Sequence, residues 1–312
     1  MKKELLNVLG LPLLNKSFFN LSENLIHKFA GGYILSFHEI TPEQFEKQVK
    51  SLLPSEPIPL DELIERYKLN KSIKNCISLT FDDGVEQTVL ENWKVCEKNN
   101  WPVTFYIPTD YLNGDNLPFQ KINFLSKFLT DYDLPNHLKS NKSLLKKNYL
   151  INYLTKLIYY EQKEKIRDLI NHFLNQIKIF DKSLKEKIMP KAIDKDKINI
   201  ISKNQISSFQ SHGVSHTACS ALSNQDLAYE MKESKRILED CTGRKVNGFC
   251  YPYGANVSIN KASVEFATKY FDHATTLIKG RLKRCNPYFL PRIDLYQENT
   301  VPFTKLKIIL SR

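Results

Sequence analysis

Ile77-Ser78-Leu79-Thr80-Phe81-Asp82-Asp83-Gly84 is the stretch from which the architecture of this 312-residue chain can be inferred. Its first five residues alternate between apolar and polar side chains, which is the pattern of a strand with one buried face. Aspartate is depleted in strands and Asp-Gly favours a turn, so the two aspartates are expected at the carboxyl end of the strand. That end is where α/β folds place their functional residues.

The neighbouring carboxylates of Asp82 and Asp83 repel each other. Such a pair favours either a raised pKa on one aspartate or a cation bound near both. A metal ligand beside a general base would use both carboxylates. The alternative is a solvated turn in which one aspartate caps the next helix, and the stretch alone leaves the two interpretations equally open.

The composition is typical of a soluble globular protein, with 42% hydrophobic and 25% charged residues. The length permits one large α/β domain or two smaller ones. A net charge of +11 would suit an anionic partner, such as a phosphate group, an acidic glycan, nucleic acid or a membrane surface. The lysines are spread through helical segments and no nucleic-acid-binding motif accompanies them, so we expect no nucleic-acid partner.

The cysteines and the N-terminal segment indicate the cellular compartment in which the protein is expected. Six cysteines are scattered without a Cys-x-x-Cys pair, which argues against a disulfide framework or a cysteine zinc site. In the N-terminal segment, residues 1–31, polar residues break the apolar run, so it is a poor signal-peptide core and too short to span a bilayer. We therefore expect a cytoplasmic protein without a transmembrane segment, and peripheral membrane contact through an amphipathic N-terminal helix stays open.

Further strands and helices are expected on both sides of the aspartates. Residues 32–40 are typical of a buried strand that ends near His38, and Thr41, followed by proline, is a strong helix start. A helix and then a strand at 103–107 follow the aspartates. This βαβ unit predicts a parallel sheet. Regular α/β patterns resume later and end in a strand at 289–294.

Residues 113–201 have a different character. Lysine-rich amphipathic helices are expected at 149–160 and 163–177, and little strand pattern is present. We interpret the segment as a helical insertion within a single catalytic domain that spans residues 32–312. Such an insertion would lie between barrel elements, where it can shape or cover a cleft.

A second short motif, Ser211-His212-Gly213-Val214-Ser215-His216, carries two histidines. The His-x-x-x-His spacing puts two imidazoles on one side of a helical turn or tight loop. Taken alone, the spacing is common and packing histidines explain it as well. Together with the aspartates, one carboxylate and two imidazoles give three ligands with room for water, the open arrangement of a catalytic metal site.

Three motifs occur in the order and rough spacing of the polysaccharide deacetylase family, also called the NodB-type domain or carbohydrate esterase family 4. They are Thr80–Gly84, Ser211–His216 and Phe249-Cys250-Tyr251-Pro252-Tyr253-Gly254. The chain further resembles the branch whose domain opens with a strand ending in Tyr-His or similar, here Phe37-His38. The resemblance covers roughly residues 32–295 apart from the insertion. It implies a distorted (β/α) barrel, TIM-like but with fewer strands, and metal-dependent removal of an acetyl group from an N-acetylated sugar.

The resemblance also implies roles for individual residues. Asp83, His212 and His216 match the metal ligands, and Zn²⁺ is the expected ion. Asp82 matches the general base that takes a proton from water. His38 matches the general acid of the branch with the early histidine, in which no late Leu-x-His motif is needed.

Two further residues complete the expected site, and two positions depart from the family pattern. Tyr253 is where the family places a backbone N–H that stabilises the oxyanion. Cys250 replaces the arginine that holds the base aspartate, and Arg292 is the candidate replacement, with a purely structural salt bridge as the alternative. Gly213 replaces a serine or threonine whose hydroxyl would brace the histidine loop.

The expected substrate is an N-acetylated sugar within a glycan, or one linked to a lipid or a nucleotide. The lack of an export signal favours a lipid-linked or nucleotide-linked sugar made inside the cell, and the positive charge would suit a phosphate-bearing substrate. The alternative is a catalytically inactive carbohydrate- or phosphate-binding protein on the same fold. We rank it lower because the set of metal ligands is complete.

Overall fold

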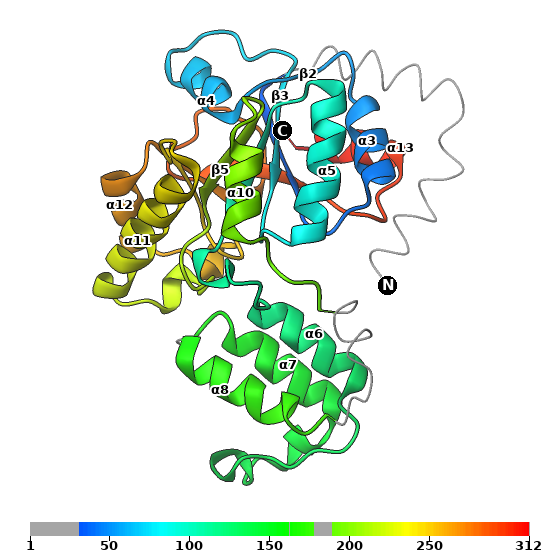
Figure 1. The fold of residues 1–312 in the computed structure, drawn as a ribbon, viewed down its shortest axis with the longest axis vertical. Helices are drawn as coiled ribbons and strands as arrows, with labels where there is room; N and C mark the ends of the chain where they lie inside the picture. The colour runs from blue at the N-terminus through cyan, green and yellow to red at the C-terminus, as the bar shows by residue number, and fades with distance from the viewer. Residues whose placement is uncertain (1–30, 162, 178–188, 312) are drawn as a thin grey trace.

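The computed structural model describes residues 31–161, 163–177 and 189–311. In this part of the chain seven parallel strands form a closed barrel in the order β1-β3-β4-β5-β6-β7-β8, with β8 pairing back to β1. The short strand β2 pairs with the start of β3. The expected (β/α) barrel with fewer strands than a TIM barrel is confirmed (Figure 1). The strands are β1 (Tyr33–Phe37), β2 (Glu56–Pro57), β3 (Cys76–Phe81), β4 (Val103–Ile107), β5 (Ser207–Ser211), β6 (Gly248–Cys250), β7 (His273–Lys279) and β8 (Leu290–Leu295).

Helices surround the barrel, as parallel strands require for their crossover connections (Figure 1). The predicted helix start at Thr41 is present, because its side chain accepts the Gln44 N–H at 3.4 Å and Pro42 is the first helical residue. The helices are α3 (Pro42–Lys50), α4 (Leu60–Lys68), α5 (Glu86–Asn99), α10 (Lys195–Ser202), α11 (Asn224–Thr242), α12 (Lys261–Tyr270) and α13 (Val301–Ile309), with short 3-10 turns η1 (Thr109–Tyr111), η4 (Cys219–Ala221) and η5 (Asn256–Ser258).

A row of phenylalanines crosses four neighbouring strands on the side that faces the helices. The ring centroids of Phe37 and Phe81 are 5.2 Å apart, those of Phe81 and Phe105 are 5.6 Å apart, and those of Phe105 and Phe209 are 5.4 Å apart. Phe45 of α3 packs edge-on against both Phe37 and Phe81. These contacts fix the outward face of β1, β3, β4 and β5 in the hydrophobic core.

The alternation of side chains along β3 directs its polar residues into the barrel. Phe81 faces the helices, so its neighbours Thr80 and Asp82 face the opposite way. Both meet Arg292 of β8, which donates hydrogen bonds to Thr80 Oγ1 at 3.1 Å and to the Asp82 carboxylate. The Arg292 side chain is fully buried, so the barrel interior at this end is a polar, charged layer.

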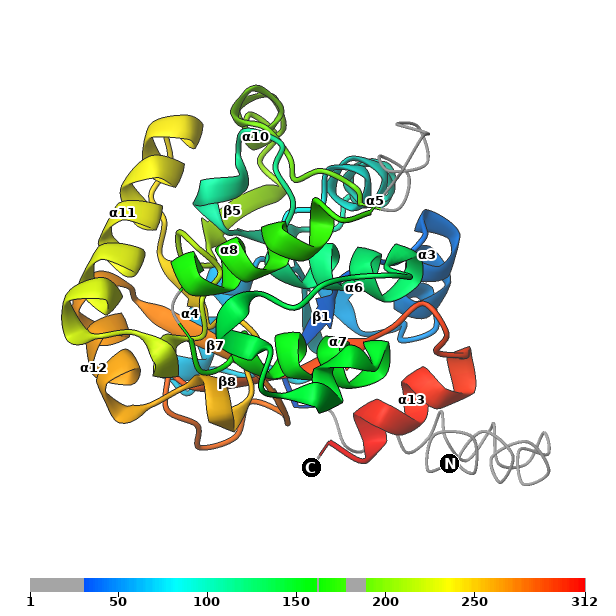
Figure 2. The same cartoon turned by 90° about the horizontal axis from the view of Figure 1, so that it is seen from below.

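The segment between β4 and β5 forms a second group of helices. The two helices predicted there are present with slightly different ends, and α6 precedes them. Figures 1 and 2 show these helices lying across one end of the barrel. The elements are α6 (Pro118–Phe128), η2 (Asn136–Leu138), η3 (Lys142–Leu145), α7 (Lys147–Leu157) and α8 (Lys163–Leu174). They pack around a hydrophobic core of their own, which includes Ile122, Leu125, Leu150, Leu154, Ile170 and Phe173.

Two expectations from the sequence concern the N-terminal segment and the membrane. Residues 1–30, for which the sequence leaves an amphipathic helix open, lie outside the described residues, as do residues 178–188 of the predicted insertion. Among the described residues no helix combines the length and the apolar character needed to cross a bilayer.

Candidate active site

The carboxyl ends of the barrel strands carry the residues that the sequence singled out. His38 follows β1, the aspartate pair follows β3, His212 follows β5 and Tyr253 lies in the loop after β6. Because the barrel strands run parallel, these ends meet at one rim. Asp83 has a φ of +70°, a left-handed conformation that aspartate tolerates better than most residues, and this turns its side chain away from that of Asp82.

Asp83, His212 and His216 converge. Nε2 of His216 lies 3.1 Å from Oδ1 of Asp83, and Nε2 of His212 lies 3.6 Å from the same oxygen. Burial alone would raise the pKa of the Asp83 carboxyl, but its contacts with the two imidazoles hold that pKa well below its ordinary value, so the group is a carboxylate. One carboxylate and two imidazoles with donor atoms within 4.8 Å of one another fit a zinc ion with an open coordination position.

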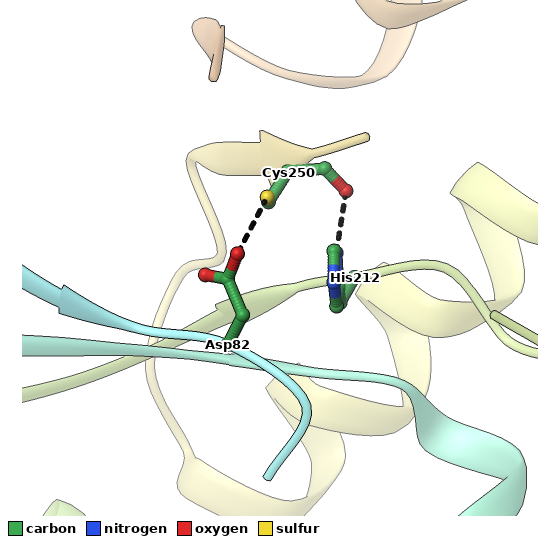
Figure 3. A group of neighbouring side chains, drawn as sticks. All are labelled: Asp82, His212 and Cys250. Carbon is green, nitrogen blue, oxygen red and sulfur yellow. Dashed lines mark hydrogen bonds between the residues drawn. The ribbon is translucent and has the colours of Figure 1, made fainter. Parts of the chain in front are cut away.

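A second set of neighbouring donor atoms consists of Asp82, His212 and Cys250 (Figure 3). This set lies against Arg292, whose Nη2 is 2.6 Å from Asp82 Oδ2 and 3.0 Å from the Cys250 sulfur. A cation placed there would face a buried guanidinium at contact distance, which is strongly unfavourable in a low-dielectric interior. The Asp83 set is therefore the better cation site.

Arg292 donates a hydrogen bond to each oxygen of the Asp82 carboxylate. Its Nη1 lies 2.7 Å from Oδ1 and its Nη2 lies 2.6 Å from Oδ2, a bidentate pair, while its Nε donates to the Thr276 carbonyl at 2.8 Å. Burial would raise the pKa of Asp82, but the charge of the guanidinium outweighs it and lowers that pKa. The contact expected from the sequence between Arg292 and Asp82 is thus present across the barrel.

His38 lies between two carboxylates. Its Nε2 is 3.7 Å from Asp82 Oδ2, and its Nδ1 is 3.4 Å from Asp294 Oδ1. Partial burial favours the neutral ring, but the contact with Asp294 and the charges of Asp83 and Asp82 raise the pKa of His38 to about 9. With 28% of its side chain exposed, His38 is more open to solvent than the two carboxylates.

Asp294 was not identified from the sequence, although a signal was available. It lies two residues after Arg292 on β8, and side chains two residues apart on a strand share a face. If Arg292 is expected to hold Asp82, the two-residue period of the strand predicts Asp294 on the same face.

The histidine loop is held by a carboxylate that sequence reasoning also missed. Glu230 of α11 accepts hydrogen bonds from the backbone N–H of Val214 at 2.6 Å and of Ser215 at 2.9 Å. Gly213 has a φ of +78°, and a Cβ on it would lie 2.9 Å from a Glu230 carboxylate oxygen. The glycine therefore makes room for Glu230, which braces the loop in place of the missing hydroxyl.

The carbonyl of Cys250 orients the first histidine of the loop. It lies 2.8 Å from Nδ1 of His212, so that nitrogen carries the hydrogen and Nε2 is left to face Asp83 (Figure 3). Metal-binding histidines are commonly held in this manner by a second partner.

The helical insertion contributes aromatic rings to the site. Tyr253, with a φ of +63°, places its ring 4.6 Å from that of His216 and 5.0 Å from that of Tyr159, which follows α7. Phe119 of α6 lies 5.9 Å from the His216 ring. Neither insertion residue was predicted, because nothing in the local sequence reports a contact across this distance in the chain.

Comparison with known proteins gives one family. A family model described as "Polysaccharide deacetylase" matches residues 70–271. Among solved structures, the deacetylase PplD of Streptococcus pyogenes has a TM-score of 0.57 at 14% identity, covering 89% of this chain and 98% of that one. A polysaccharide deacetylase from Bacillus cereus gives 0.56 at 18% identity, covering 89% of this chain and 69% of that one. IcaB of Ammonifex degensii gives 0.56 at 12% identity, covering 91% and 98%. At these identities the structural likeness shows the fold alone. No curated protein sequence matches the chain.

Proposed function

The chain belongs to the polysaccharide deacetylase family, and we propose that it is a metal-dependent hydrolase that removes the acetyl group from an N-acetylated sugar. The matched region, residues 70–271, includes both the aspartate pair and the histidine loop. Family membership supports carbohydrate deacetylase activity. The cation and the roles of individual residues are part of the proposal.

The observation that carries the proposal is that two neighbouring carboxylates have separate environments. Asp83 faces two imidazoles, whereas Asp82 faces Arg292 and His38. Carboxylates with different partners can take different roles in one reaction. Here one is suited to hold a cation and the other to accept a proton.

Asp83, His212 and His216 would hold the cation, for which we propose zinc. When bound, such a cation polarises the amide carbonyl and lowers the pKa of water. The chain prepares the two histidines differently: the Cys250 carbonyl orients His212, and Glu230 holds the loop that carries His216.

Asp82 is the proposed general base. Its lowered pKa keeps it ionised at neutral pH, and two hydrogen bonds from Arg292 fix the orientation of its carboxylate. An ionised, oriented carboxylate can take the proton of an attacking water without first losing one of its own. Arg292 acts on the reaction only through Asp82 and is a positioning residue.

His38 is the proposed general acid. An amine leaves the tetrahedral intermediate readily only when its nitrogen is protonated, and a pKa of about 9 means that His38 carries a proton at neutral pH. Asp294 positions it. For the oxyanion we propose the backbone N–H of Tyr253, for which no backbone acceptor is found among the described residues.

Acetate release tests the proposal. The full chain is stripped of metal with a chelator, reloaded with zinc chloride and incubated with N-acetylglucosamine oligomers; zinc should restore a rate that stripping abolished. Asp82→Asn should bind zinc normally and lose about 10²- to 10⁴-fold in kcat. Asp240→Asn, the same change at an exposed carboxylate of α11, is the control. Turnover that survives stripping would refute metal dependence, and full turnover by Asp82→Asn would refute the role of that residue.

A further inference from the structure

The far end of the helical insertion carries several lysines in a stretch of sequence without acidic residues. We call residues 136–149 the insertion tip; it contains η2, η3 and the first turn of α7. Figure 1 shows the connection between α6 and α7 at the end of the molecule opposite the barrel. Residues 134–160 contain no aspartate or glutamate. The lysines of the tip are Lys139, Lys142, Lys146 and Lys147.

Two apolar side chains project from the same tip. Leu145 is 58% exposed and Tyr149 is 57% exposed. Their neighbours in sequence, Leu144 and Leu150, are buried in the core of the insertion. Those buried neighbours anchor the backbone of the tip, so Leu145 and Tyr149 are directed outward from a fixed support.

Charge together with the pairing of two apolar side chains distinguishes the tip from other places where an apolar side chain is exposed. Exposed Leu310 also lies in an acid-free stretch, residues 299–312, but it is the single large apolar side chain exposed among the described residues of that stretch. Single exposed apolar residues are ordinary, and Tyr229 on α11, for example, stands directly beside Glu230 in sequence. The nearest acidic residues to Leu145 in sequence are Asp133 on one side and Glu161 on the other. Exposed apolar groups among lysines, with no acid close by in the chain, are suited to a surface that is both anionic and apolar.

We propose that the insertion tip docks on an anionic lipid bilayer. The lysines are attracted to the negative surface potential of the headgroups, and Leu145 and Tyr149 enter the boundary between headgroups and acyl chains. A nucleic acid would satisfy the charge of the lysines, but it offers no apolar environment for Leu145. The tip is remote from the barrel rim, so the proposal does not rest on the proposed function.

Sedimentation with lipid vesicles tests the proposal on the full chain. Vesicles of phosphatidylcholine mixed with phosphatidylglycerol are compared with vesicles of phosphatidylcholine alone, over a range of sodium chloride concentrations. We expect the chain to sediment with the anionic vesicles, to remain in the supernatant with the neutral ones, and to be released as salt is raised. Equal sedimentation with both kinds of vesicle, or none with either, would overturn the proposal.

Paired variants separate the two contributions. Lys142→Gln with Lys146→Gln should weaken vesicle binding about thirtyfold, whereas Lys203→Gln with Lys232→Gln, an equal loss of charge on barrel helices, should change it little. Leu145→Ser with Tyr149→Ser should weaken binding about tenfold at unchanged charge, against Ile200→Ser with Tyr229→Ser as the control.

Acetate release measured in solution, without vesicles, keeps this test separate from the proposed function. All these variants should release acetate from N-acetylated oligomers at the rate of the unchanged chain. Full vesicle binding by both tip variants would place the contact elsewhere and overturn the proposal. Unchanged vesicle binding by the serine variant, together with tight binding of single-stranded DNA lost in the glutamine variant, would make the tip a nucleic-acid surface instead.

Discussion

The barrel rim and the helical insertion differ in where they keep their charges. At the rim the carboxylates of Asp82 and Asp83 are buried, and each has cationic or imidazole partners at defined distances. In the insertion tip the charges are lysines, of which Lys139, Lys142 and Lys146 are exposed to solvent. Burying a charge lowers the stability of the fold unless the charge is paired, so the fixed geometry of the rim depends on these partners. Exposed lysines cost little and are free to meet a partner.

This difference indicates that the proposed catalytic residues and the proposed membrane contact belong to separate parts of one chain. The rim is held in place by parallel strands and the insertion by its own hydrophobic core. The two parts meet around His216, where Phe119 of the insertion contacts its ring directly and Tyr159 contacts it through the ring of Tyr253. Variants in each part should therefore affect different measurements, except at that junction.

The largest effect is expected at the cation site. Asp83→Ala should abolish zinc binding and lower kcat/KM on the order of 10³-fold or more, because the cation supplies several kcal/mol of transition-state stabilisation. Zinc content of the purified protein and acetate release measure the two effects. The tip variant Leu145→Ser with Tyr149→Ser is the matched control and should retain both. An Asp83→Ala protein that still binds zinc and still releases acetate would contradict the assignment of the cation site to the rim.

The next effect concerns the brace of the histidine loop. Glu230→Ala should weaken zinc binding about 10- to 100-fold, because loss of a supporting group misplaces a ligand. Gly213→Ser should also weaken it, since the new Cβ would lie 2.9 Å from the Glu230 carboxylate. The double variant should bind zinc better than the two separate losses would predict, because removal of Glu230 makes room for the serine.

Calorimetric zinc titrations measure that coupling, and thermal unfolding checks that each variant folds. Strictly additive losses would mean that Glu230 and Gly213 do not share the role assigned to them. The test depends on the sign of the coupling free energy between the two substitutions and not on its size. The positive φ of Gly213 disfavours any side chain there even when Glu230 is removed, so the double variant should recover only part of the zinc affinity.

These residues also show what the sequence could and could not predict. The parallel sheet followed from alternation in β3 and the βαβ unit, whereas its closure into a barrel followed from the family resemblance. Asp83, His212 and His216 lie together as the motifs indicated. Glu230 left no such mark, because a carboxylate that accepts backbone N–H groups looks in sequence like any acid on an amphipathic helix. Sequence periodicity reports which face a residue occupies, not which loop that face will meet.

A smaller effect is expected from the partner of His38. Asp294→Asn should lower the pKa of His38 from about 9 toward its ordinary value of 6.5, because one of the charges that favour the imidazolium is lost. The acid form is required, so the alkaline limb of the kcat/KM profile should move to lower pH by about one unit or more, and activity near pH 9 should fall about tenfold. His38→Ala removes the acid itself and should lose most of the rate at every pH.

The same pair affects stability with a defined sign. A folded-state pKa raised above the unfolded value contributes stability that is fully present below about pH 6.5 and is lost as the pH rises through about 9. The contribution should shrink in Asp294→Asn, so the difference in thermal midpoint between the two proteins should be larger at pH 6 than at pH 9.5. A purely structural Asp294 would lower the midpoint equally at both pH values and leave the alkaline limb in place.

The smallest expected effect lies at the junction of the two parts. Tyr159→Ala removes a ring that packs on Tyr253, and an aromatic pair contributes about 0.5–1.5 kcal/mol, so kcat/KM should fall roughly two- to tenfold. Tyr159→Phe keeps the ring and should retain nearly full activity. Because Tyr253 also contacts His216, a loss in kcat would mean that the insertion helps to set the rim, whereas a rise in KM alone would mean that it only borders the substrate. No change in either constant would show that the Tyr159 contact is independent of the chemistry, and Phe119 would then be the residue of the insertion through which an effect on His216 has to pass.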